Sequence, residues 1–281
     1  MLPGEPESKH GPFKTNQVIS RTVRDSAALF HETQDRNGPF EPVPPISRSS
    51  DRRPLRIGLA IDIEGAIPTE TPVRDAQLST ASLLEELGHS VEEVRYPVDA
   101  EEFFEAHTNA FLRQFLVVAE AAESLSGFPA ADSGLLDPFT ASILTYAASI
   151  SDEEAEAGMA FLDALPHKFA AAFEEVDLIL SPVTPVASIA ADALRPDQYF
   201  TNESRKFLED RMSFCAPVNV VGNCAMSIPL NSARDTGLPV GSMLQAATGN
   251  DRLLYECALE LEDARPWKDR WAPYSIRYIP V

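Results

Sequence analysis

The sequence offers cysteines, histidines and serines as side chains that could attack a substrate, move a proton or bind a metal. Cys215 and Cys224 are nine residues apart, too far for the C-x₂-C spacing of a zinc site, and no second pair accompanies them. None of the five histidines stands in a recognisable catalytic context, so a thiolate–imidazole pair is not indicated. We therefore expect the cysteines to pack in the interior, and we expect no metal site and no cofactor.

Serine chemistry is also hard to place in this chain. Ser49 and Ser50 lie beside a charged Asp-Arg-Arg stretch without a flanking glycine, and we interpret them as part of a linker. The sequence has no G-x-S-x-G elbow. A loop that binds an oxyanion through its backbone needs adjacent glycines, and no two of the 13 glycines adjoin. We interpret His89 as a polar residue at the turn into a strand, so no catalytic residue is assigned.

Composition narrows the class of protein. Of the 281 residues 44% are hydrophobic, which is enough for a packed core. The formal net charge of −20 repels phosphate backbones, so a nucleic-acid partner is not expected. Three cysteines are too few for a disulfide framework, and the sequence has neither a signal-peptide pattern nor an apolar run of about 18 residues. These features predict a soluble, cytoplasmic protein without a membrane segment.

The elements that would position a site begin with a βαβ unit. Residues 55–61 form an apolar run typical of a strand. Thr71 and Pro72 suit the N-cap and the first position of a helix, which Gly88 is well placed to end. Residues 91–96 then predict a second strand, and the strand–helix–strand order indicates parallel pairing. Before this unit, the sequence predicts an irregular arm, a helix capped by Thr22 and a proline-rich linker.

The middle of the chain, residues 100–176, predicts mainly helices. Its aromatic side chains recur near helical spacing and are expected to form core or pocket wall: Phe103, Phe104, Phe111 and Phe115. Ser151, followed by three acidic residues, starts a further helix, in which Pro166 predicts a kink. Residues 190–211 are polar and irregular, and we interpret them as a mobile flap.

The C-terminal part carries the clearest pattern. An apolar strand over residues 225–230 closes on Pro229, and a Gly-Leu-Pro turn leads into a buried strand over residues 240–246. Asn250 supplies a side-chain acceptor for the start of the last helix, and Pro266 ends that helix.

This order of elements resembles the C-terminal end of the amidase signature family. The matching motifs are Asn219 and Gly222 before a strand, the G-L-P-V-G turn at 237–241, Gly249-Asn250-Asp251 and Pro266-Trp267. Segments at 20–29, 87–91 and 177–185 also match. The resemblance implies an α/β fold with a mixed central sheet and helices on both faces. It further implies that residues 1–281 are the C-terminal part of a single amidase domain, with residues 1–54 as arm, helix and linker, and residues 55–281 as α/β body.

In that family, a lysine and two serines hydrolyse an amide bond, and backbone N–H groups stabilise the oxyanion. None of these three residues can be carried over to this chain, because the matching segment of the family precedes Met1. The resemblance implies instead that the chain shapes the substrate pocket, whose lining residues would be Thr184, Met212, Ser213, Cys215 and Ala216. We expect an incomplete amidase fold, inactive on a small-molecule amide without the N-terminal half.

A second hypothesis remains open for this sequence. The chain could be a non-catalytic interaction subunit with an amidase-derived fold, or a subunit that complements a separate N-terminal half or forms a homo-oligomer. The five pocket residues would then have an ordinary packing role between helix and strand.

Overall fold

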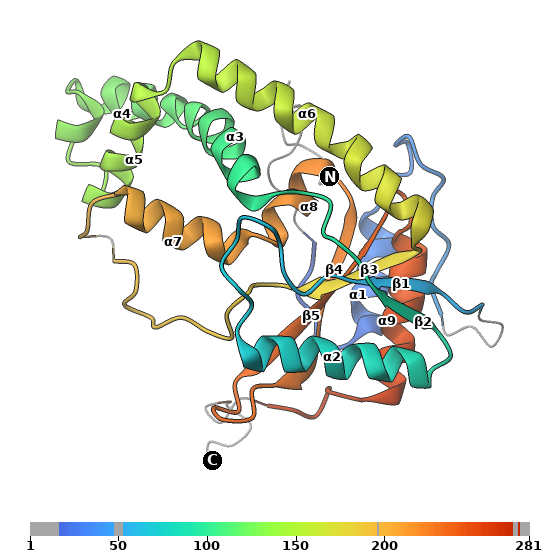
Figure 1. Cartoon of the computed structure of the whole chain (residues 1–281). Coiled ribbons are helices and arrows are strands. Elements are labelled where there is room, and N and C mark those ends of the chain that lie inside the picture. The colour runs from blue at the N-terminus through green and yellow to red at the C-terminus, as the bar shows by residue number, and fades with distance from the viewer. Residues whose placement is uncertain (1–16, 48–52, 196, 272–274, 276–281) are drawn as a thin grey trace.

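The computed structural model describes residues 17–47, 53–195, 197–271 and 275. Five strands form one sheet: β1 (Arg56–Leu59), β2 (Ser90–Glu93), β3 (Leu178–Pro182), β4 (Cys224–Ser232) and β5 (Pro239–Ala246). Their order is β2-β1-β3-β5-β4 (Figure 1). β1 runs parallel to β2 and β3, whereas β5 runs antiparallel to β3 and β4. The sheet is thus mixed, as predicted, and the first two strands are the parallel pair of the predicted βαβ unit.

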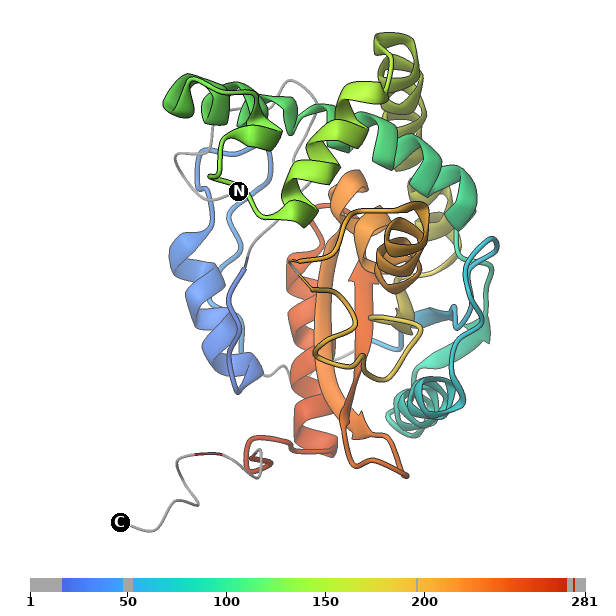
Figure 2. The ribbon, with the colours of Figure 1, turned by 90° about the vertical axis from the view of Figure 1, so that its left-hand side faces the viewer.

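Three helices cover one face of the sheet: α1 (Val23–Thr33), α2 (Thr71–Glu86) and α9 (Asp251–Ala264). Their apolar side chains pack on Ile57, Leu180 and Leu244, which point to this face because side chains alternate along a strand. Figure 2 shows α1 beside α9, and α9 beside β4. The predicted cap of α1 is confirmed, since the Thr22 hydroxyl accepts a hydrogen bond from the Asp25 N–H at 3.1 Å.

Two helix starts differ from the sequence prediction. α2 has Glu70 as its N-cap, so Thr71 is the first helical residue and Pro72 the second. Glu70 is held ahead of the helix because its N–H donates to the Pro185 carbonyl at 2.9 Å. Asn250 is the N-cap of α9 as predicted, but its side chain makes no cap hydrogen bond. Its backbone (φ −95°, ψ 31°) lies outside the extended region in which a side-chain cap forms.

The opposite face of the sheet carries α3 (Ala100–Arg113), α6 (Asp152–Glu175) and α8 (Cys215–Val221). These helices pack on Ile179 and Met243 of the sheet. A Cβ atom at Gly158 would lie 2.5 Å from the Ala106 carbonyl oxygen, so glycine allows α3 and α6 to approach closely. The predicted start of α6 is confirmed, because Ser151 forms a capping box. Helices on both faces agree with the predicted α/β architecture.

An outer group of helices lies beyond this layer (Figure 1): α4 (Leu116–Ser126), the 3₁₀ turn η1 (Ala130–Asp132), α5 (Pro138–Ser149) and α7 (Asn202–Met212). The prediction of an irregular flap over residues 190–211 is wrong for its second half, which forms α7. The helix starts there because the Thr201 side chain accepts from the Ser204 N–H at 3.2 Å, and Ser204 Oγ accepts from the Thr201 N–H at 2.8 Å. None of the helices in the described ranges is long and apolar enough to cross a lipid bilayer.

β4 does not close on Pro229 as the sequence suggested, but continues to Ser232. The pairing with β5 shifts between Ile228 and Asn231, which marks an irregularity at the proline. β4 lies at the edge of the sheet, where a proline without an N–H is tolerated. The strand therefore passes through Pro229 instead of stopping there.

Candidate functional site

The loop after β3 meets the start of α8. The Cys215 thiol donates a hydrogen bond to the Val183 carbonyl at 2.9 Å, and the next residue in the loop, Thr184, donates its hydroxyl to the Val186 carbonyl at 2.7 Å. Burial raises the pKa of Cys215 to about 11, so its thiol is neutral at pH 7 and suited to act as a donor. The structure thus brings two of the five predicted pocket residues together.

The other three predicted residues lie around the junction of α7 and α8. Met212 is 39% exposed, whereas Ser213 is fully buried and donates its hydroxyl to the Asp210 carbonyl at 3.0 Å. Ala216 is partly buried and packs against the apolar cluster beneath α8. Of these three, Met212 is the residue that reaches a cavity.

A buried polar network holds this junction against the sheet. Gln245 of β5 and Ser181 of β3 are fully buried, and Gln245 Nε2 donates to Ser181 Oγ at 2.8 Å. The Tyr96 hydroxyl lies 3.2 Å from Gln245 Oε1 and 3.2 Å from the carbonyl oxygen of Phe214, the residue before Cys215. Burial raises the pKa of Tyr96, so its hydroxyl remains a donor. The sequence analysis did not identify this network, although glutamine and serine inside two apolar runs were a usable signal.

Small residues line the sheet beside the loop. A Cβ atom at Gly241 would lie 2.7 Å from Ser227 Oγ and 2.9 Å from Val183 Cγ2, so this position admits no side chain without movement. Ala225 and Ser227 of β4 are exposed. β4 pairs with β5 on one side and forms the edge of the sheet on the other within the described residues. The surface next to Val183 is therefore built from small side chains and an open strand edge.

A cavity of about 260 Å³ lies among the helices on the far side of Met212. Its wall combines residues of α3, α5 and α7 with a few neighbours: Phe104, His107, Thr108, Phe111, Leu112, Phe115, Val118, Thr140, Ile143, Leu144, Phe200, Arg205, Leu208, Glu209 and Met212. The wall is mainly aromatic and aliphatic, which is the usual character of a small-molecule site. This confirms the expectation that the aromatic side chains of α3 are core or pocket wall.

The cavity also has a polar wall. Glu209 Oε1 accepts from the Thr108 hydroxyl at 2.8 Å and from Arg205 Nη1 at 3.1 Å. Burial raises the pKa of Glu209, and the hydrogen bond from Thr108 and the charge of Arg205 oppose this rise. Burial lowers the pKa of His107 to about 4, so its ring is neutral at pH 7 where it stacks on Phe111 at 5.1 Å.

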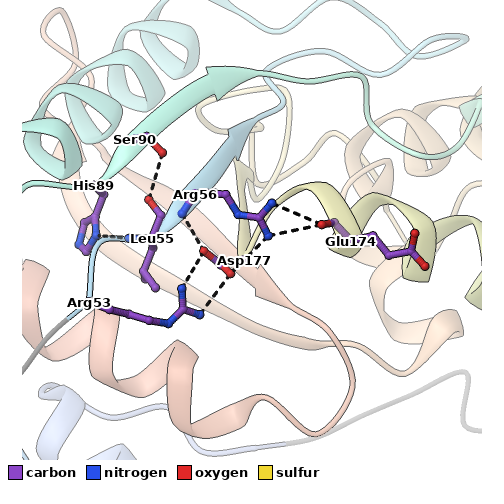
Figure 3. Close-up of polar contacts among 7 residues, drawn as sticks. All are labelled: Arg53, Leu55, Arg56, His89, Ser90, Glu174 and Asp177. Carbon is purple, nitrogen blue, oxygen red and sulfur yellow. Dashed lines mark hydrogen bonds and ion pairs between the residues drawn. The ribbon is translucent and has the colours of Figure 1, made fainter.

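His89 has the structural role expected from the sequence (Figure 3). Its Nδ1 accepts from the Leu55 N–H at 3.1 Å, and its Nε2 lies 3.3 Å from Glu260 Oε2. Nearby, burial alone would raise the pKa of Asp177, but hydrogen bonds such as those from Arg53 outweigh it and leave the pKa lowered. These contacts join β1 to its neighbours at the end remote from Thr184. Within the described residues, no three His, Cys, Asp or Glu side chains are grouped as metal ligands.

Comparison with known proteins gives a consistent result. The profile of the Amidase family matches residues 11–255. The putative amidase AmiC of Mycobacterium tuberculosis is 33% identical over 276 residues, which cover 97% of this chain and 57% of AmiC. A glutamyl-tRNA(Gln) amidotransferase subunit of Acidothermus cellulolyticus is 29% identical over 306 residues, covering 96% of this chain and 56% of that protein. The chain thus spans about half the length of the curated relatives it matches.

Solved structures share the fold. A bacterial aryl acylamidase of the amidase signature family superposes with a TM-score of 0.74 at 20% identity, covering 95% of this chain and 56% of that one. A 6-aminohexanoate cyclic dimer hydrolase, in complex with its substrate, superposes with a TM-score of 0.65 at 21% identity, covering 93% and 60%. The five-stranded sheet and its helices therefore correspond to part of a larger known architecture.

Proposed function

The chain belongs to the amidase family, and on this premise we propose that it forms the pocket-shaping part of an enzyme that hydrolyses the carbon–nitrogen bond of a small amide. Residues 1–281 would be the C-terminal part of one amidase domain. The serine nucleophile and the lysine base would come from residues outside this sequence. The lack of adjacent glycines among the 13 in the chain supports this division, because a backbone oxyanion site needs them.

One contact carries the proposal. The Cys215–Val183 hydrogen bond joins two segments that are 32 residues apart in sequence. Together these segments hold four of the five predicted pocket residues: Thr184, Ser213, Cys215 and Ala216. The polar network of Tyr96 and Gln245 fixes the start of α8 behind this contact. A pocket wall of this kind must be rigid, because a misplacement of about 1 Å lowers the rate of a positioned reaction.

Cys215 would shape the pocket and not attack the substrate. The attacking species in cysteine chemistry is the thiolate, and burial raises the pKa of Cys215 to about 11. Its thiol also donates to the Val183 carbonyl, which favours the protonated form. A nucleophile for amide cleavage must therefore come from elsewhere.

The open edge of β4 would receive the remainder of the enzyme. Edge strands of this length offer unpaired backbone groups to another strand, and natural proteins usually protect them. Small residues on the adjoining surface, such as Ser227 and Gly241, would let a second backbone approach closely.

The experiment is an amide-hydrolysis assay of the purified chain with benzamide and acetanilide. We expect no turnover above the buffer rate, and we expect the coding sequence upstream of Met1 to contain an in-frame lysine and a Gly-Ser-Ser-Gly motif. A full-length amidase serves as the positive control. Robust turnover by the 281 residues alone would contradict the division of roles.

A non-catalytic subunit is the second candidate, and the same open edge of β4 favours it, since an edge can also pair with a separate chain. Size-exclusion chromatography and urea unfolding of the isolated chain distinguish the two. A monodisperse protein that unfolds cooperatively without a partner would support the non-catalytic role, and aggregation of the isolated chain would support the enzyme part.

A further inference from the structure

The cavity among α3, α5 and α7 has room for one ring and a substituent. Its volume of about 260 Å³ exceeds the roughly 150 Å³ of an engineered cavity that binds benzene. Figure 1 shows these three helices together at one end of the molecule, away from the sheet. Phe111, Phe200 and Ile143 stand for the apolar wall, one from each of three separate segments. An aromatic or branched aliphatic group fits this volume and this surface.

Charge pairing on the wall excludes a charged ligand. Arg205 and Glu209 neutralise each other through an ion pair of 3.1 Å, and Glu209 also accepts from Thr108. The ring of His107, the remaining titratable group of the wall, is neutral at pH 7 because burial lowers its pKa to about 4. A ligand carboxylate or ammonium would lose its hydration without gaining a free counter-charge from the wall.

One donor on the wall remains unsatisfied. Arg205 Nε is buried and has no hydrogen-bond partner, although the Nη1 atom of the same guanidinium binds Glu209. A buried donor without a partner costs free energy, which an acceptor on a ligand would recover. An oxygen acceptor attached to the apolar group therefore suits this wall better than a plain hydrocarbon.

Met212 connects the cavity with the pocket. Its side chain lines the cavity and is 39% exposed, and Val118 on the wall is 36% exposed, so part of the wall reaches solvent. Methionine is unbranched and adapts to different ligands. The residue that follows Met212 begins the segment leading to Cys215 and the loop of Thr184.

From these observations we propose that the cavity binds the side group of the amide substrate, an uncharged aryl or branched alkyl group with one hydrogen-bond acceptor that Arg205 engages. The identification of the ligand as an amide rests on the proposed function. The existence and selectivity of the cavity as a binding site do not, and the experiment measures them without hydrolysis.

The test uses ¹⁹F NMR titrations of the whole chain with three probes: fluorobenzene, 4-fluoroacetophenone and 4-fluorobenzoate. We expect saturable binding of the first two, with the ketone about 2- to 10-fold tighter, the factor that one net hydrogen bond supplies. 4-Fluorobenzoate should bind at least about 10-fold more weakly than the ketone, because its charge is unpaired on this wall. Absence of saturable binding, or equal binding of the benzoate, would overturn the proposal.

Variants locate the site. Ile143→Trp fills the cavity and should abolish binding of both uncharged probes. Leu125→Trp adds the same bulk on α4 at a side chain that is 81% exposed, and should leave binding unchanged. Phe200→Ala enlarges the cavity and should bind 1-fluoronaphthalene at least about 5-fold more tightly than the wild type, a gain that loss of folding cannot produce. Wild-type binding in Ile143→Trp, or no gain in Phe200→Ala, would place the probes elsewhere and refute the assignment.

The role of Arg205 has its own variant. Arg205→Leu combined with Glu209→Gln removes both charges together, so that no single buried charge is left behind, and glutamine can still accept from Thr108. We expect this double variant to bind fluorobenzene as the wild type does and to lose its preference for the ketone. A preserved preference would show that Arg205 is not the donor.

A last titration separates this inference from the proposed function. Benzamide should displace fluorobenzene competitively, whereas acetamide should not at the same concentration. If fluorobenzene binds the cavity but benzamide does not displace it, the assignment of the cavity to an amide substrate fails, while the amidase assignment of the chain is untouched. Conversely, absence of hydrolysis by the chain has no bearing on these titrations.

Discussion

The two ends of α3 lie in regions of opposite character. Phe103 and Phe104, near its start, pack into the closed core between the sheet and α6, where polar groups such as Gln245 are satisfied by other side chains. His107 and Phe111, further along, line a cavity whose wall keeps an unsatisfied donor. The closed region fixes the position of the pocket residues, and the open region leaves room for a ligand. One helix thus links the rigid support to the candidate binding surface.

The largest effect is expected from breaking the closed region. Phe169 is fully buried and meets Tyr96 edge to face at 5.7 Å, so Phe169→Ala should lower the free energy of unfolding by about 3–5 kcal/mol. Phe111→Ala, on the cavity wall, should cost clearly less because its partly exposed ring already borders empty space. Urea unfolding followed by circular dichroism measures both. Equal losses would contradict the distinction between the two regions.

The second effect concerns pH and the open region. Burial lowers the pKa of His107 to about 4, below the roughly 6.5 of an unfolded histidine. The neutral ring therefore stabilises the fold above about pH 6.5, and this contribution is lost as the pH falls through 6.5 towards 4.

His107→Phe tests that sign, since phenylalanine keeps the stacking positions between Phe103 and Phe111 without a titratable group. Between pH 7 and pH 4.5, the free energy of unfolding of the wild type should fall by about 2–3 kcal/mol more than that of His107→Phe. Urea unfolding at a series of pH values provides the measurement. Parallel pH profiles would show that His107 is not held neutral by burial.

The smallest effect comes from a single hydroxyl of the closed region. Tyr96→Phe removes the donor that faces Gln245 and the Phe214 carbonyl, and should cost about 1–2 kcal/mol because the acceptors remain buried. Tyr199→Phe removes a hydroxyl from a side chain that is 70% exposed and should change stability by less than about 0.5 kcal/mol. Thermal and urea unfolding of the pair give the comparison, and similar costs at both positions would refute the role of the network.

Local patterns predicted much of the sheet and several helix ends. The small and apolar run 240–246 became β5, Gly88 adopts the positive φ of 94° expected after a helix, and Ser151 caps α6. These predictions succeeded because the signal lies within a few neighbouring residues.

Other features depend on partners far along the chain. Pro229 does not end β4, because a sheet edge tolerates a proline, and the edge position follows from the strand order. α7 was missed because its polar composition hides the cap at Thr201. The cavity needs Phe111, Phe200 and Met212 from three segments, and their meeting is set by helix packing that no local pattern encodes. The resemblance supplied the pocket residues, and the Cys215 contact to Val183 appeared only in the structure.

The central claim is that this chain shapes a pocket and does not carry the nucleophile. Treatment of the purified chain with a fluorophosphonate probe, followed by peptide mass spectrometry, tests it most directly, with a full-length amidase as the positive control. The account predicts that no serine of these 281 residues is labelled under conditions that label the control. Stoichiometric labelling of one serine in the folded chain would contradict it.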